Sequence, residues 1–176
     1  MSIRPPFAAI AALALATSGI ALGAAPLQAL TERPQSAFPA LIGELYAAVD
    51  RADLAQYREL YASAAALDAV RDGKPLPTGT ELTMVTYAAQ RDDAGVPEGD
   101  GQGRFVRGDL IAYLYMRKGG GEAEFGRWRF QVFSPDKRVD AKAKLGECAA
   151  CHQKRSAQDF VFSRDWMKTR PSAAPR

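Results

Sequence analysis

Five consecutive residues near the end of the chain, Cys148-Ala149-Ala150-Cys151-His152, constrain what it can become more than any other feature. Two cysteines separated by two residues and followed directly by a histidine form the pattern used for covalent attachment of c-type haem. In that chemistry the two thiols bond to the haem and the imidazole binds the iron as proximal ligand. The sequence contains 2 cysteines and 1 histidine, so all of them lie in this motif. We therefore expect Cys148 and Cys151 to hold one covalent haem c, and His152 to be the metal ligand.

Three other interpretations of the motif stay open at the level of sequence. A lone disulfide between the two cysteines needs no cofactor. A thioredoxin-like redox pair belongs near a βαβ pattern, and none is found here. Half of a zinc site needs further strong ligands, but the sequence holds no other cysteine or histidine. Haem attachment is the interpretation that uses all three residues.

The first 29 residues have the pattern of a secretory signal peptide. Arg4 supplies the positive charge, and a run of small and apolar residues over 8–22 supplies the apolar region. A retained membrane anchor is the alternative, although this alanine-rich run is marginal for crossing a bilayer. We expect cleavage near Ala24 or Ala29 and a mature protein in the periplasm.

One domain remains after removal of the signal peptide, because the rest of the chain has the length of a single typical domain. We assign this haem c domain to residues 30–169 and expect residues 170–176 to be a disordered tail. The formal net charge is +3 at pH 7 and no basic run stands out. Charge therefore argues against a nucleic acid partner.

The first part of the domain has helical periodicity. Ser36 can cap a helix over 37–49. The apolar stripe of that helix would comprise Phe38, Leu41, Ile42, Leu45 and Val49. Asp53 can cap a second helix that ends near Tyr61, and Ser63 a third over 64–71. The sequence thus predicts N-terminal helices.

A region rich in β-branched and aromatic residues follows, divided by glycine-rich turns. It predicts strands over 80–88, 105–116 and 127–133, with a mobile loop over 91–103. Residues 160–162 can form a short fourth strand, and the cysteine motif ends a helix predicted over 140–151. The predicted fold class is therefore α+β, with an antiparallel meander sheet as core, N-terminal helices and a C-terminal haem-bearing helix.

The sixth coordination position of the iron is left open by the sequence. A single histidine excludes two histidine ligands, so a methionine, a lysine or a water completes the iron, or the iron is five-coordinate. The methionine candidates are Met84, Met116 and Met167. The predicted strands supply an apolar wall that can serve as sheet core, as haem cover or as both. It consists of Leu82, Met84, Leu114, Met116, Trp128 and Phe130.

Further motifs accompany the strands and the cysteine motif. They are Pro77-x-Gly79-Thr80, Gly108-Asp109-Leu110-Ile111, Trp128-x-Phe130-x-x-Phe133 and, after the cysteine motif, Asp159-Phe160-Val161-Phe162-Ser163. Together with Cys148-Ala149-Ala150-Cys151-His152 they resemble the cytochrome P-460 family, whose domain is shared with the cytochromes c′-beta. The resemblance covers roughly residues 57–165, and its last segment is the most specific part.

The resemblance implies a periplasmic haem protein with a mostly antiparallel sheet and a five-coordinate iron. The namesake enzymes of the family oxidise hydroxylamine, using a lysine cross-linked to the haem and a distal carboxylate. In our alignment these two positions are occupied by Met84 and Leu114, which supply neither an amine nor a general base. Lys74 and Asp109 lie close enough in sequence to take over either role. Either substitution would require a shift in the strand alignment, and a shift of one residue turns every side chain of a strand to the opposite face of the sheet.

The function that fits these features best is binding of a diatomic gas or small nitrogen oxide at an apolar distal pocket, as in the cytochromes c′-beta. Nitric oxide is the leading candidate, with a redox partner protein and a homodimer compatible with the same interpretation. Hydroxylamine oxidation is one alternative, which leaves enzymatic activity uncertain. Others are a simple electron-transfer cytochrome and a four-helix cytochrome c′. The alternation over 127–133 argues against the four-helix fold.

Overall fold

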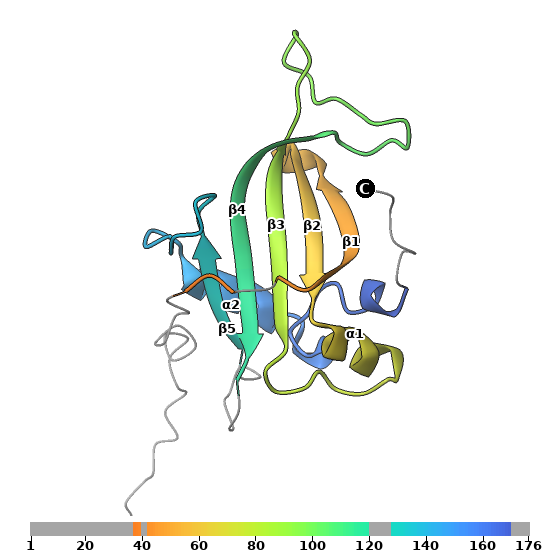
Figure 1. Ribbon diagram of the computed structural model, residues 1–176, viewed down its shortest axis with the longest axis vertical. Coiled ribbons are helices and arrows are strands. Elements are labelled where there is room, and N and C mark those ends of the chain that lie inside the picture. The colour runs from red at the N-terminus through yellow and green to blue at the C-terminus, as the bar shows by residue number, and fades with distance from the viewer. Residues whose placement is uncertain (1–36, 40–41, 120–127, 170–176) are drawn as a thin grey trace, which may run out of the picture.

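The computed structural model describes residues 37–39, 42–119 and 128–169. Its central element is an antiparallel sheet of five strands in the order β1-β2-β3-β4-β5, a meander in which sequence neighbours pair (Figure 1). The strands are β1 (Glu44–Arg51), β2 (Gln56–Ala62), β3 (Glu81–Ala89), β4 (Arg107–Lys118) and β5 (Trp128–Phe133). The helices in the described part are α1 (Ala64–Arg71) and α2 (Leu145–Gln153), with single 3-10 turns between elements. The predicted α+β class and the antiparallel meander are confirmed.

The two helices predicted before residue 62, over 37–49 and 53–61, are wrong. Strands β1 and β2 occupy this region and pair from Glu44↔Ala62 to Arg51↔Gln56. A 3-10 turn at Ala52–Leu54 joins them, and Ala55 with φ 47° closes it. Helix propensity was outweighed by tertiary context, because β2 also pairs with β3 along its whole length.

The third predicted helix and the three main strands are confirmed. Helix α1 has the predicted bounds, and Gly73 follows it with φ +71°. Ser63 begins the helix through its carbonyl, which accepts hydrogen bonds from the amides of Ala66 and Leu67. Strands β3, β4 and β5 start and end within two residues of the predicted positions.

Two C-terminal predictions need correction. Helix α2 begins at Leu145 and not at residue 140, because the Asp140 carboxylate accepts the amide of Lys142 and holds a turn there. The strand predicted over 160–162 is wrong, since Asp159 and Phe160 have φ of 55° and 64° and turn the chain. The predicted signal peptide and tail lie outside the described residues. Within those residues, no helix is long and apolar enough to cross a membrane.

One face of the sheet packs against both helices and the C-terminal segment to form the core (Figure 1). Buried side chains from the sheet include Leu60, Leu82, Met116, Trp128 and Phe130. They meet Leu67, Val70, Ala149, Val161 and Met167 from the other side. The helix that carries the cysteine motif is therefore anchored on this face.

The opposite face has a different character. Phe38, which precedes β1, lies edge-on to Tyr113 and Phe133 at ring-centroid distances of 4.7 and 5.3 Å. Further along this face the buried carboxylate of Glu59 accepts hydrogen bonds from Tyr61 at 2.8 Å and Arg107 at 3.0 Å. The cysteine-bearing helix packs on the other face of the sheet, so the candidate site lies there.

Candidate functional site

A cavity of about 470 Å³ lies between the sheet and the C-terminal segment. Its sheet wall includes Leu60, Leu82, Met84, Leu114, Met116 and Phe130. Its other wall includes Cys148, Cys151, His152, Val161 and Phe162. The volume is within the range of cofactor sites, and the lining is mainly apolar. The cysteine motif and the predicted strand wall thus face one shared cavity.

Helix α2 places both cysteines at the cavity. Residues three apart on an α-helix share a face, so Cys148 and Cys151 point the same way. Both thiols are free, with Cys148 partly buried and Cys151 exposed. Burial raises the pKa of the Cys148 thiol. No group of three or more histidine, cysteine, aspartate or glutamate side chains in the described part could hold a metal ion, which gives the zinc interpretation no support.

The imidazole of His152 is held in one tautomer. Its Nδ1 lies 2.7 Å from the backbone oxygen of Phe160. A carbonyl oxygen can only accept a hydrogen bond, so Nδ1 carries the proton and Nε2 keeps its lone pair. Burial lowers the pKa of His152, while the hydrogen bond to Phe160 acts in the opposite direction. The ring contacts Phe130 and Phe162 at centroid distances of 5.0 and 5.1 Å. The result is a neutral imidazole with a free nitrogen for a metal.

The two distal positions from the sequence alignment, Met84 and Leu114, are neighbours in the sheet. They are direct register partners on β3 and β4, and both line the cavity. Lys74 and Asp109 do not line it, and the Lys74 ammonium pairs with Asp72 in solvent. All lysines of the sequence lie in the described residues, and none of them reaches the cavity. No carboxylate of the described residues lines it either.

The other residues predicted near the haem differ in whether they line the cavity. Met84 and Met116 line the cavity, whereas Met167 is fully buried in the core away from it. Trp128, which the sequence placed on the apolar wall, does not line the cavity and is fully buried. Its indole Nε1 donates to the backbone oxygen of Asp159 at 2.9 Å. Trp128 therefore supports the segment that follows the cysteine motif.

Arg58 is a lining residue that sequence reasoning missed. It lies on β2, and its Nε and Nη2 donate to Gln56 Oε1 at 3.1 and 2.6 Å. Burial lowers its pKa, and no carboxylate among the described residues forms an ion pair with it. In a strand, residues two apart share a face, so Arg58 would point the same way as the apolar Leu60. The helix predicted over this segment placed the two side chains on different faces, and so the signal was missed.

A buried hydrogen bond joins β1 to the C-terminal wall of the cavity. The Tyr46 hydroxyl and Ser163 Oγ lie 2.6 Å apart. Burial raises the pKa of Tyr46 to about 12, so the phenol stays protonated over the physiological range. The hydroxyl pair ties the first strand to the segment that follows the histidine, and so closes one end of the cavity.

A family model described as Cytochrome P460 matches residues 42–163. The match covers more than half of the chain and includes all five strands, both helices and the cysteine motif. The chain belongs to the cytochrome P460 family. A comparison with curated proteins gave no match. Family membership makes the chain a haem-binding cytochrome, as the sequence resemblance predicted.

The residues present fit a haem. A macrocycle is a large apolar body, and the cavity offers an apolar wall of sheet residues to cover it. Two free thiols and a neutral imidazole, all on α2, lie along the facing wall. Arg58 adds a cation on the sheet wall, suited to an anionic group. Cys148, Cys151 and His152 are the residues that would hold the haem.

Proposed function

We propose that this protein is an exported cytochrome with a single haem c, attached through Cys148 and Cys151 and bound at the iron by His152 Nε2. Each thiol would add its S–H across one vinyl group, forming a thioether with no leaving group. The observation that carries the proposal is the placement of the Phe160-bound His152 beside two free thiols on one cavity wall.

The distal side supports a ligand-binding role. When bound, haem iron supplies a coordination site for a small diatomic molecule and one-electron redox chemistry. Met84 and Leu114 can exclude water from that side but can neither transfer a proton nor form a lysine cross-link. A five-coordinate iron that binds nitric oxide or a related small nitrogen oxide is therefore the proposed state.

Arg58 adds the polar component of this pocket. Its guanidinium has no carboxylate partner among the described residues, so its remaining N–H groups are available to a ligand. A charged donor in a partly desolvated pocket stabilises negative charge that develops on a bound ligand. This favours a ligand that withdraws electron density from the iron.

Electron transfer with a methionine on the iron is the second candidate. It is favoured by one observation, that Met84 and Met116 both line the cavity. Such a protein would be six-coordinate in both oxidation states and would bind gases weakly. The two candidates therefore differ in coordination number, which is directly measurable.

Absorption spectra of the exported holoprotein separate these candidates. We expect a high-spin ferrous spectrum that changes on addition of carbon monoxide or nitric oxide, and the same behaviour in Met84→Leu and Met116→Leu variants. A low-spin ferrous protein that becomes high-spin in one of these variants would instead establish methionine ligation. Proteolysis adds a check on hydroxylamine oxidation, because a haem peptide that also carries a lysine peptide would revive that activity.

The periplasm is the proposed location, because c-type haem is attached outside the cytoplasm and the first 29 residues have the pattern of an export signal. Cell fractionation with N-terminal sequencing of the holoprotein tests this. Recovery of a cytoplasmic, full-length protein that carries haem would refute it. A redox partner protein and a homodimer are further proposals that are compatible with the haem c function. Titration with candidate electron donors and measurement of the molar mass in solution test them.

A further inference from the structure

The turn that follows the cysteine motif controls the partner of His152. Asp159 and Phe160 have φ of 55° and 64°, although neither is glycine. This left-handed conformation costs a non-glycine residue about 1–2 kcal/mol, so the surrounding structure has to hold it in place. The backbone oxygen of Phe160 is the acceptor of the His152 Nδ1 proton at 2.7 Å. Whatever fixes this turn also fixes that hydrogen bond.

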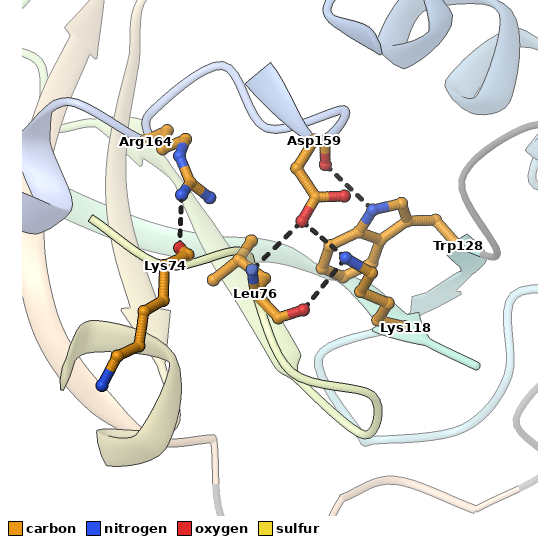
Figure 2. A network of polar contacts seen from close by, with 6 residues as sticks. All are labelled: Lys74, Leu76, Lys118, Trp128, Asp159 and Arg164. Carbon is orange, nitrogen blue, oxygen red and sulfur yellow. Dashed lines mark hydrogen bonds and ion pairs between the residues drawn. The ribbon is translucent and has the colours of Figure 1, made fainter. Parts of the chain in front are cut away.

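A largely buried ion pair fixes the turn (Figure 2). Lys118 Nζ, at the end of β4, lies 2.6 Å from Asp159 Oδ2 and also donates to the backbone oxygen of Leu76 at 3.0 Å. The side chains of Lys118 and Asp159 are only 12% and 20% exposed. Solvent therefore screens this pair much less than a surface pair.

Two further hydrogen bonds converge on the same residue. The amide of Leu76 donates to Asp159 Oδ2 at 3.3 Å, and the Trp128 indole donates to the Asp159 backbone oxygen at 2.9 Å. Asp159 is thus held from β4, from β5 and from the segment after α1 (Figure 2). None of these groups lines the cavity, so the network acts on the site through the turn.

The geometry points to Lys118 and Asp159 as positioning residues for the proximal ligand. Their ion pair holds the Phe160 oxygen where it accepts the His152 Nδ1 proton, and so sets the basicity of Nε2 toward the iron. This inference rests on the proposed haem c function. A histidine that donates a stronger second hydrogen bond is a more basic ligand, which stabilises the oxidised iron. Loss of the ion pair would weaken that hydrogen bond and raise the reduction potential.

A purely electrostatic effect of the two charges predicts something different. Removal of the positive charge of Lys118 would lower the potential, whereas removal of the negative charge of Asp159 would raise it. The positioning role predicts the same direction for both, because either change releases the turn. The signs of the two shifts therefore distinguish the explanations.

The experiment uses the holoprotein with Lys118→Met and Asp159→Asn, since asparagine tolerates the left-handed conformation and isolates the charge. Lys118→Arg keeps a positive charge for the ion pair with Asp159, so this variant should behave like the wild type. Lys74→Met is the matched control, because Lys74 pairs with Asp72 in solvent with its side chain 68% exposed. Reduction potential and the iron–histidine stretching frequency of the ferrous protein are the readouts.

We expect Lys118→Met and Asp159→Asn each to shift the ferric-to-ferrous balance about tenfold toward ferrous. This corresponds to a reduction potential about 59 mV higher, and the iron–histidine stretching frequency should be lower in each. Lys118→Arg and Lys74→Met should match the wild type. Shifts of opposite sign, or an unchanged stretching frequency, would overturn the inference while the wild-type haem spectrum upholds the proposed function. A wild-type protein without haem would overturn both. Should Lys118→Met not fold, Lys118→Gln and Asp159→Asn give the same comparison of signs.

Discussion

Replacement of Gly43 by alanine tests the corrected description of the N-terminal region. Gly43 precedes β1 with φ +94°, and a Cβ there would lie 2.4 Å from the oxygen and 2.6 Å from the carbonyl carbon of Ala62. Both are backbone atoms of the paired strand β2 and cannot move without disturbing the β1–β2 ladder. In the helix predicted over 37–49, the same substitution would instead stabilise the protein by about 1 kcal/mol. The two descriptions therefore predict opposite signs.

The expected destabilisation has two components. The left-handed conformation costs alanine about 1–2 kcal/mol, and insertion of a methyl group against fixed atoms costs about 1–3 kcal/mol. Together they give a loss of about 2–5 kcal/mol in the free energy of unfolding. At about 3–5 °C per kcal/mol for a domain of this size, the midpoint of thermal unfolding should fall by roughly 10 °C.

Two other glycines serve as matched controls. Gly79 has φ +86° but no atom within 4 Å of the position that a Cβ would take, so Gly79→Ala should show only the conformational cost of about 1–2 kcal/mol. Gly146 in α2 has open space and no positive φ, so Gly146→Ala should stabilise by up to about 1 kcal/mol. Thermal unfolding of the holoprotein, followed by far-ultraviolet circular dichroism, measures all three. A higher midpoint for Gly43→Ala, or a loss no larger than that of Gly79→Ala, would refute the reasoning.

Three further predictions concern the cavity and its walls. Arg58→Leu should speed dissociation of nitric oxide from the ferrous protein about tenfold, as expected for loss of one hydrogen bond from a charged donor, and Arg58→Lys should recover part of it; equal rates in all three proteins would contradict a ligand contact. Tyr46→Phe and Ser163→Ala should each cost about 1 kcal/mol, but the double variant should cost less than their sum because both remove the 2.6 Å hydrogen bond; strictly additive losses in chemical denaturation would count against it. Burial lowers the pKa of His152, so in haem-free protein the unfolded chain takes up its proton first. Stability should then be constant above about pH 6.5 and fall below it down to the lowered folded pKa, a slope that His152→Gln should remove. An unchanged slope in that variant would disprove the assignment.

Local signals explain which parts of the fold could be predicted. Helix α1 ends at Arg71 and is followed by Asp72-Gly73, a standard helix stop. Strands β3 to β5 carry β-branched residues or strict alternation between glycine-rich turns. Strand β1 has no such signal. Leu45 and Val49 are four residues apart and fit a helical stripe, while the alanines between them favour a helix. Only pairing with β2, which itself depends on β3, makes this segment a strand.

The candidate site likewise has features that local sequence predicts and features that depend on tertiary contacts. Cys148, Cys151 and His152 are adjacent in sequence, so their proximity was predictable. The strand assignments put Met84 and Leu114 on the apolar wall, but only the structure shows that they are register partners. The hydrogen-bond partner of His152 is the backbone oxygen of Phe160, and a backbone contact of this kind cannot be predicted from the identity of the residue. The ion pair between Lys118 and Asp159 spans 41 residues and involves two common surface residue types. Such contacts follow from tertiary structure alone.

The proposed function depends on one haem held covalently in the cavity by the cysteine motif. The most direct test is the absorption spectrum of protein exported by cells competent for c-type cytochrome maturation, recorded before and after extraction with acidified acetone. We expect a haem spectrum that stays with the polypeptide after extraction, and its loss from the polypeptide in a Cys148→Ala/Cys151→Ala variant. A colourless protein, or colour that leaves entirely with the solvent, would contradict the account.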